Sequence, residues 1–325
     1  MSSAPPVPEV ELPELMLGHY TTPEGHILAR APLGLTAYLD RPEQWAHGGA
    51  ERIFSLFLER VPRSYLRFMS TSVMSTWKGV DETTLPEVLE SMRYAGALRG
   101  MRHLFWMKLA NDPGAPALGI SYTEVDPRRA SRAGVLEITL PETWDPQALL
   151  ELALEILDTA PVHSLVGGFT FRYDVHDEAN AFNQIYCWAS RYLAIDVQKA
   201  EDMAWLAPRA LPGSSWLTYV GKSVASEAGI DLVSLRATAF RGDVRVTDVA
   251  DGLLFRAGES PMQGDLNRMR FPFAYAEVAR ALAPWFASPP PDLWGTFFRQ
   301  RQSELWFRRL IDPAAWVERE LEHEP

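Results

Sequence analysis

The sequence predicts an α+β fold: a single domain in which a mixed, mainly antiparallel sheet is flanked by helices. Segments with the two-residue period of strands and segments with the 3.6-residue period of helices follow one another without the steady alternation of a parallel α/β sheet. No segment has the composition of a linker, and the Pro run at residues 288–291 is too short and too late to separate domains. We therefore expect residues 1–25 to form a flexible, acidic, Pro-rich arm and residues 26–325 to form one globular domain.

The first half of the domain combines helices with a β-hairpin. Apolar residues at helical spacing predict a helix over residues 42–60, and Thr84 is suited to cap a second helix. The apolar run 103–109, the turn residues 111–114 and the extended pattern 118–125 together predict a hairpin of two strands.

The second half continues with both element types. In residues 135–140, apolar side chains alternate with Glu137 and Thr139, which predicts a strand with one buried face. Further helices are expected over residues 145–159, 177–191, 222–228, 273–286 and 298–320, and further strands over residues 164–172, 216–220, 232–240 and 253–257.

Composition excludes several classes of protein. Of the 325 residues, 47% are hydrophobic and one is Cys, so disorder and a disulfide scaffold are excluded. The formal net charge of -11 argues against direct nucleic-acid binding, which needs a basic excess. There is no run of about 20 apolar residues and no signal peptide, so we expect a cytoplasmic protein that does not contact membranes. Cys187 lies in an apolar helical pattern and is expected to be a buried, inert thiol.

The sequence also lacks the common catalytic motifs, so we expect no catalytic residues, no metal and no cofactor. The patterns G-x-S-x-G, G-x-G-x-x-G and H-E-x-x-H do not occur. Residues 221–223 match the end of a phosphate-binding P-loop, but Trp216 stands where the first glycine is required. None of the four lysines follows a carboxylate by two positions, as metal-dependent nucleases of the PD-(D/E)xK type require.

One group of residues leaves a divalent-metal-dependent enzyme open as an alternative. Asp174, His176, Asp177 and Glu178 form the densest group of oxygen and nitrogen ligands in the chain. Acidic residues at the start of a helix are equally well explained by capping and by the helix dipole.

The distribution of charge indicates a partner-binding surface. Glu151, Glu155 and Asp158 are spaced i, i+4, i+7 on the expected helix 145–159, which places three carboxylates on one face. Glu142 and Asp145 precede them, and residues 133–171 contain no Lys or Arg that could offset these charges. Such a surface would attract a basic partner and accelerate its association.

Several short motifs carry a family resemblance. They comprise residues 215–221 (SWLTYVG), 252–258 (GLLFRAG) and 261–267 (PMQGDLN), with Tyr275 and its helix, the strand and Pro at 135–141, and the Gly pair before Phe169. Over roughly residues 30–290, the chain resembles the bacterial type VI secretion immunity family associated with VRR-NUC nuclease effectors. The resemblance implies a cytoplasmic protein without catalytic residues that binds a cognate toxin effector and blocks it. It also implies structural roles for Trp216, Gly221, Gly264 and Asp265.

We therefore expect an immunity protein that neutralises a toxin effector, a nuclease, by covering its substrate-binding surface. Its contact residues are expected to be Glu142, Asp145, Glu151, Glu155 and Asp158. Besides the metal-dependent enzyme, a general protein-interaction scaffold that uses exposed Trp294 and Trp306 is a second alternative. Whether the chain forms homo-oligomers is left open.

Overall fold

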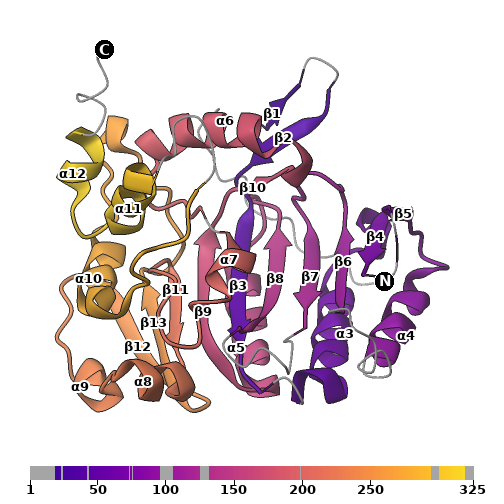
Figure 1. Ribbon diagram of the computed structural model, residues 1–325, viewed down its shortest axis with the longest axis horizontal. Helices are drawn as coiled ribbons and strands as arrows, with labels where there is room; N and C mark the ends of the chain where they lie inside the picture. Colours follow the sequence, from indigo (N-terminus) through magenta and orange to yellow (C-terminus); the bar gives the residue numbers. More distant parts are fainter. Residues whose placement is uncertain are drawn as a thin grey trace.

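A ten-stranded sheet forms the centre of the molecule, and helices lie against both of its faces (Figure 1). The structure is a computed structural model that describes residues 19–22, 25–41, 44–72, 74, 76–95, 105–124, 132–197, 199–293 and 300–318. The strands are β1 (Tyr20–Thr21), β2 (Ile27–Arg30), β3 (Leu33–Leu39), β4 (Phe68–Thr71), β5 (Lys78–Gly79), β6 (Trp106–Ala110), β7 (Gly119–Thr123), β8 (Gly134–Leu140), β9 (Val162–Phe169), β10 (Arg172–Tyr173), β11 (Leu217–Val220), β12 (Val244–Val249) and β13 (Gly252–Ala257).

The helices alternate irregularly with these strands along the chain. They are α3 (Ala50–Arg60), α4 (Leu85–Ala95), α5 (Pro146–Thr159), α6 (Glu178–Arg191), α7 (Ala200–Met203), α8 (Lys222–Ala228), α9 (Leu232–Arg236), α10 (Phe273–Leu282), α11 (Gln300–Arg308) and α12 (Pro313–Glu318). Short turns of 3-10 or π helix are η1 (Trp45–Gly49), η2 (Arg63–Tyr65), η4 (Val175–Asp177), η5 (Leu266–Arg268) and η6 (Ala283–Trp285). No helix of the described part of the chain is long and apolar enough to cross a membrane.

The large sheet has the order β12-β13-β11-β9-β3-β8-β7-β6-β4-β5, and β1, β2 and β10 form a small second sheet. Every pairing between these strands is antiparallel. This arrangement confirms the predicted α+β class, including the expected hairpin, which is formed by β6 and β7. The arm 1–25 lies almost entirely outside the described residues, so the domain division at residue 25 stays a prediction.

Strand β3 lies at the centre of the sheet, although no element was predicted for residues 26–41. All seven of its residues are buried, and it pairs with β8 on one side and β9 on the other. A strand covered on both faces has no polar alternation, so its apolar run does not show the period of two.

Strand β8 was expected to have one buried face, but six of its seven residues are buried. Leu136 and Ile138 face the main core beneath α3 and α5. Val135 belongs to a smaller cluster on the opposite face, with Tyr38 and with Met203 of α7. The prediction of a single buried face was wrong because the chain around α7 covers the second face.

Element boundaries agree with expectation where local capping is strong. Helix α8 ends at its cap Gly229, which adopts a left-handed conformation with φ of 70°.

Three elements in the second half differ from the prediction. The strand expected at 232–240 is wrong, because Asp231 accepts hydrogen bonds from the backbone N–H groups of Val233 and Ser234 and starts α9. The half-exposed strand β12 was missed. The single helix expected at 298–320 is two helices, α11 and α12.

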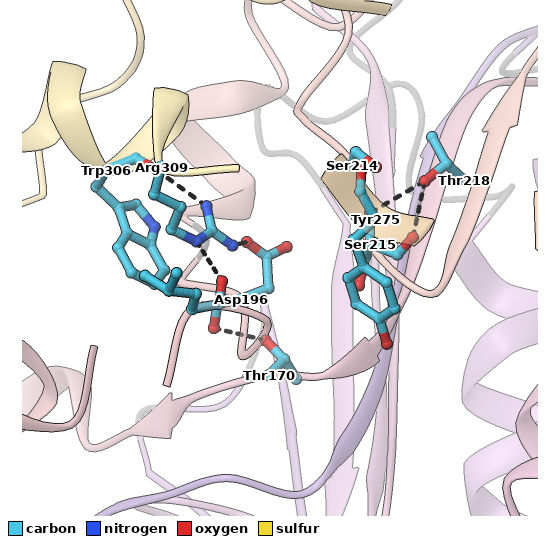
Figure 2. Close-up of polar contacts among 9 residues, drawn as sticks. Thr170, Asp196, Ser214, Ser215, Thr218, Tyr275, Trp306 and Arg309 are labelled. Carbon is cyan, nitrogen blue, oxygen red and sulfur yellow. Dashed lines mark hydrogen bonds and ion pairs between the residues drawn. The ribbon is translucent and has the colours of Figure 1, made fainter. Parts of the chain in front are cut away.

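The two C-terminal helices are joined to the core by buried Arg309 (Figure 2). Its Nε donates to the carbonyl of Leu193 at 2.7 Å, and its Nη1 donates to the carbonyl of Trp306 at 3.1 Å. Its Nη2 lies 3.5 Å from the Asp196 carboxylate, and the guanidinium stacks 3.6 Å from the Trp306 ring. Burial lowers the pKa of Arg309 to about 10, although Asp196 acts in the opposite direction.

Replacing Arg309 with Leu should lower the free energy of unfolding by about 3 kcal/mol, because it leaves the Asp196 carboxylate without its cation in a largely buried site. Urea denaturation monitored by circular dichroism measures this loss. The matched control is Arg308→Leu, since Arg308 is the exposed last residue of α11, directly before Arg309, and its loss should cost less than about 0.5 kcal/mol. Equal losses in the two variants would contradict the anchoring role.

Candidate functional site

Helix α5 presents the acidic residues that the sequence singles out. The carboxylate of Asp145 caps the helix by accepting a hydrogen bond from the backbone N–H of Gln147 at 2.9 Å. The apolar stripe of α5 packs on β3 and β9, which turns the opposite face outward. On that face, 51% of the Glu151 side chain and 79% of the Asp158 side chain are exposed.

Helix α3 lies beside α5 and supplies cations to this face. Arg60 donates to the Glu155 carboxylate from both terminal nitrogens, with an Nη2–Oε1 distance of 2.6 Å, and its Nη2 lies 3.8 Å from Glu151. Arg52 lies 3.6 Å from Asp158. The expectation that no cation offsets these acids was wrong, because Arg60 is 95 residues away from Glu155 in the sequence. The hydrogen bonds that Arg60 donates to Glu155 raise the pKa of Arg60 above its ordinary value.

The surface of α3 and α5 still carries more acid than base. The carboxylates of Glu59, Glu151, Glu155 and Asp158 face two guanidinium groups, those of Arg52 and Arg60, which leaves an excess of two negative charges. We call these six residues the α3–α5 surface. Their ion pairs hold the central carboxylate, that of Glu155, in one orientation.

The other two predicted contact residues lie at the start of α5. Asp145 is exposed, and its carboxylate is engaged as the helix cap. Glu142 is half-buried and contributes to the electrostatic environment of Arg30. The structure therefore brings Glu151, Glu155 and Asp158 together. Partner binding by all five residues stays a prediction.

The four residues of the metal alternative do not converge. Asp174 accepts a hydrogen bond from the backbone N–H of His176 at 2.9 Å and caps η4. Asp177 accepts from the side-chain amide of Asn180 at 2.8 Å, and Glu178 pairs with Lys199 at 2.8 Å. Within the described ranges, no three His, Cys, Asp or Glu residues are placed to hold a metal ion.

A second polar feature, which was not predicted from the sequence, crosses the sheet face opposite α3 and α5. The strand register aligns Ser70 of β4, Lys108 of β6, Ser121 of β7, Glu137 of β8 and Thr36 of β3 in one row. Most of this row forms the floor of a pocket of about 760 Å³. In the sequence, the only sign of this row is a charged residue inside an apolar strand pattern. The alignment of the row can be recognised only when the register of the paired strands is known.

Glu137 and Arg172 form an ion pair at the centre of this pocket. Arg172 donates to one carboxylate oxygen of Glu137, and the Ser121 hydroxyl donates to the other at 3.3 Å. Burial alone would raise the pKa of Glu137, but the charge and hydrogen bonds of Arg172, with help from Lys108 and Ser121, hold it below its ordinary value. Glu137 is therefore ionised at neutral pH. Trp77 and Trp106 line the same pocket beside this polar floor.

The residues to which the resemblance gives structural roles do have such roles. Trp216 is buried, and its indole N–H donates to the carbonyl of Gly258 at 3.1 Å. A side chain at Gly221 would place its Cβ 2.1 Å from the Val162 carbonyl oxygen. Gly264 has a φ of +71°, and the Asp265 carboxylate accepts two hydrogen bonds from Arg191.

Two expectations about single side chains were wrong. Cys187 is exposed, because α6 buries Phe182, Ile185 and Tyr186 on its other side. Trp306 is fully buried against Arg309 and cannot serve as an exposed recognition residue. Trp294, the other residue of the scaffold alternative, lies outside the described residues.

Comparisons with known proteins agree with the sequence resemblance. The family model TsiV, described as "Type VI immunity for VRR-NUC", matches residues 51–310. Among solved structures, the Pseudomonas aeruginosa T6SS protein PA0821 is similar to this chain with a TM-score of 0.77 and 18% sequence identity, covering 97% of this chain and 94% of that one. This likeness shows a shared fold. No curated protein matches the chain in sequence.

The Glu137–Arg172 pair should make stability depend on pH in the acidic range. Because the folded-state pKa of Glu137 lies below its unfolded value, the stabilisation is complete above pH values near the ordinary pKa of about 4.3 and is lost as the pH falls further. Glu137→Gln should lower the free energy of unfolding at pH 7 by about 1–3 kcal/mol and flatten its decline in acid. Urea denaturation at pH 7, 5 and 4 measures both effects. Glu259→Gln, at an exposed ion pair, should leave the profile unchanged.

Proposed function

Because the chain belongs to the family of type VI immunity proteins for VRR-NUC, we propose that it binds a cognate toxin effector, a nuclease, and neutralises it by covering the toxin's substrate-binding surface. The observation that carries this proposal is the extent of the family match. Residues 51–310 span the chain from α3 to the buried anchor Arg309, including nine of the ten strands of the large sheet. The family match therefore covers most of the fold and is not limited to a single motif.

Charge supports the proposed target surface. A nuclease holds the phosphates of its substrate with basic side chains, so its substrate-binding surface is positively charged. This chain has a net charge of -11, and complementary charge steers association and lowers the tolerance for wrong partners.

The α3–α5 surface is the proposed contact. Glu151, Glu155 and Asp158 would meet basic side chains of the toxin, with Glu142 and Asp145 beside them. Glu155 is already fixed by Arg60, so less conformational entropy is lost when a partner docks there. Leu154, which is exposed on the same helix face, adds apolar contact area.

The proposed mechanism is binding without catalysis. Covering the nuclease surface requires a rigid, complementary face and no chemical step by this chain. The proposal places the protein in the cytoplasm of the toxin-producing cell, where it meets the toxin and does not itself contact nucleic acid.

Neutralisation should be stoichiometric. Adding the purified chain to its cognate nuclease toxin should abolish DNA cleavage near a 1:1 ratio, and co-expression should restore growth of cells that express the toxin. Cleavage measured at fixed toxin and rising concentrations of this chain gives the stoichiometry. Undiminished cleavage at saturating concentrations, with no complex in size-exclusion chromatography, would contradict the proposed function.

Charge reversal tests the contact. Glu151→Lys with Asp158→Lys leaves the Glu155–Arg60 pair intact and should weaken toxin binding by about tenfold or more, mainly through slower association at low salt. Surface plasmon resonance at two salt concentrations measures the effect. The control Asp243→Lys with Glu259→Lys makes the same charge change at another exposed site. An affinity equal to that of the control would contradict the assignment of this contact surface, but it would not contradict the proposed neutralisation.

A further inference from the structure

A short turn between β13 and α10 exposes more apolar side chain than its surroundings. We define the projecting turn as residues 266–273, which run from the start of η5 to the first residue of α10. Within it, Met269 is 92% exposed and Phe273 is 70% exposed. Large apolar side chains on a folded surface often mark contact sites when they occur together.

The base of the turn is held by a network of hydrogen bonds. The Asp265 carboxylate accepts from the backbone N–H of Asn267 at 3.1 Å and from Arg191 at 2.9 and 2.8 Å. The Asp265 carbonyl accepts from the backbone N–H of Arg270 at 2.9 Å. The Gly264 carbonyl accepts from the backbone N–H of Leu193 at 3.1 Å. The tip is therefore presented by a rigid support.

The tip itself has a backbone conformation that is unfavourable for its residue. Met269 has φ of 54° and ψ of 31°, in the left-handed region where Gly and Asn are preferred. Its side chain is almost fully exposed, so it contributes little packing to the fold. Strain of this kind persists where the surrounding structure imposes it, and it is enriched at functional sites. Here the strain projects an apolar side chain into solvent.

The charge around the turn is opposite to that of the whole chain. Arg191 and Arg268 pair with the Asp265 carboxylate, whose side chain is 4% exposed, and exposed Arg270 lies in the same turn. The turn therefore carries an excess of two positive charges in a protein whose net charge is -11.

We infer that the projecting turn is a contact surface that inserts Met269 and Phe273 into an apolar depression bordered by carboxylates on the toxin. This inference rests on the proposed function and adds a contact separate from the α3–α5 surface. Met, Arg and aromatic residues are the types enriched at the centres of protein interfaces. A preformed tip binds with a smaller entropic loss than a flexible loop. An anionic membrane is a poorer fit, because the net charge of the whole chain is repelled from it.

Variants at the tip test the contact without disturbing the fold. Met269→Asn retains a residue suited to the left-handed conformation, and Phe273→Ser removes a largely exposed ring whose edge contact is with Phe271 of the same turn. The double variant should keep the melting temperature of the wild type and lose toxin affinity by about 30-fold, chiefly through faster dissociation. The control is Val233→Ser on α9, which removes a similarly exposed apolar side chain and should bind as the wild type does. Calorimetry or surface plasmon resonance with the cognate nuclease toxin gives the affinities.

The charge of the partner surface is tested by Arg270→Glu, since Arg270 has no ion pair with any residue that the structure describes. This variant should slow association several-fold at low salt and much less at high salt. If the wild type binds the toxin and the double variant binds within twofold of it, the inference is overturned while the proposed function stands. If the wild type does not bind the toxin, the proposed function itself fails. Tip-dependent sedimentation with phosphatidylglycerol vesicles, or tip-dependent self-association, would also overturn the assignment.

Discussion

The register of β3 between β8 and β9 is the constraint on which the rest of the structure depends. Successive side chains of a strand point to opposite faces, so a slip of one residue would exchange the two faces. In the observed register, Leu33 and Leu35 join the core beneath α3 and α5, while Tyr38 joins the cluster beneath α7. The position of Glu137 on the face opposite α3 and α5, beside Thr36, follows from this alignment.

The α3–α5 surface and the projecting turn show two ways to prepare a surface for binding. On the former, long flexible acids are held in place by arginines of a neighbouring helix. On the latter, Asp265 holds the backbone of the turn, and Met269 at the tip contributes little packing to the fold. The first surface offers negative charge and the second offers positive charge around an apolar tip. A partner that matched both would have to carry both kinds of complement in the right relative position, which is a demanding basis for selectivity.

Local signals allowed much of the fold to be predicted from sequence. Helix α8 was predicted with its exact range because Gly229 stops it, and α5 was predicted because Asp145 caps a strongly amphipathic segment. Strand β3 was missed because a strand covered on both faces shows no alternation, and α9 was taken for a strand although Asp231 caps it. The acids of α5 were found correctly as a group, but their pairing with Arg60 depends on how two distant helices pack. The polar row through Glu137 depends on the alignment of five strands, which no single segment records.

The exposed thiol of Cys187 has a practical consequence for experiments on this protein. Since it is the only cysteine among the 325 residues, a maleimide dye attaches at one defined position without any engineered substitution. That position is one helical turn from Arg191, whose guanidinium donates to the Asp265 carboxylate at the base of the projecting turn. A fluorophore attached to Cys187 therefore lies near the projecting turn. A change in its emission on complex formation reports that the bound protein contacts this side of the molecule.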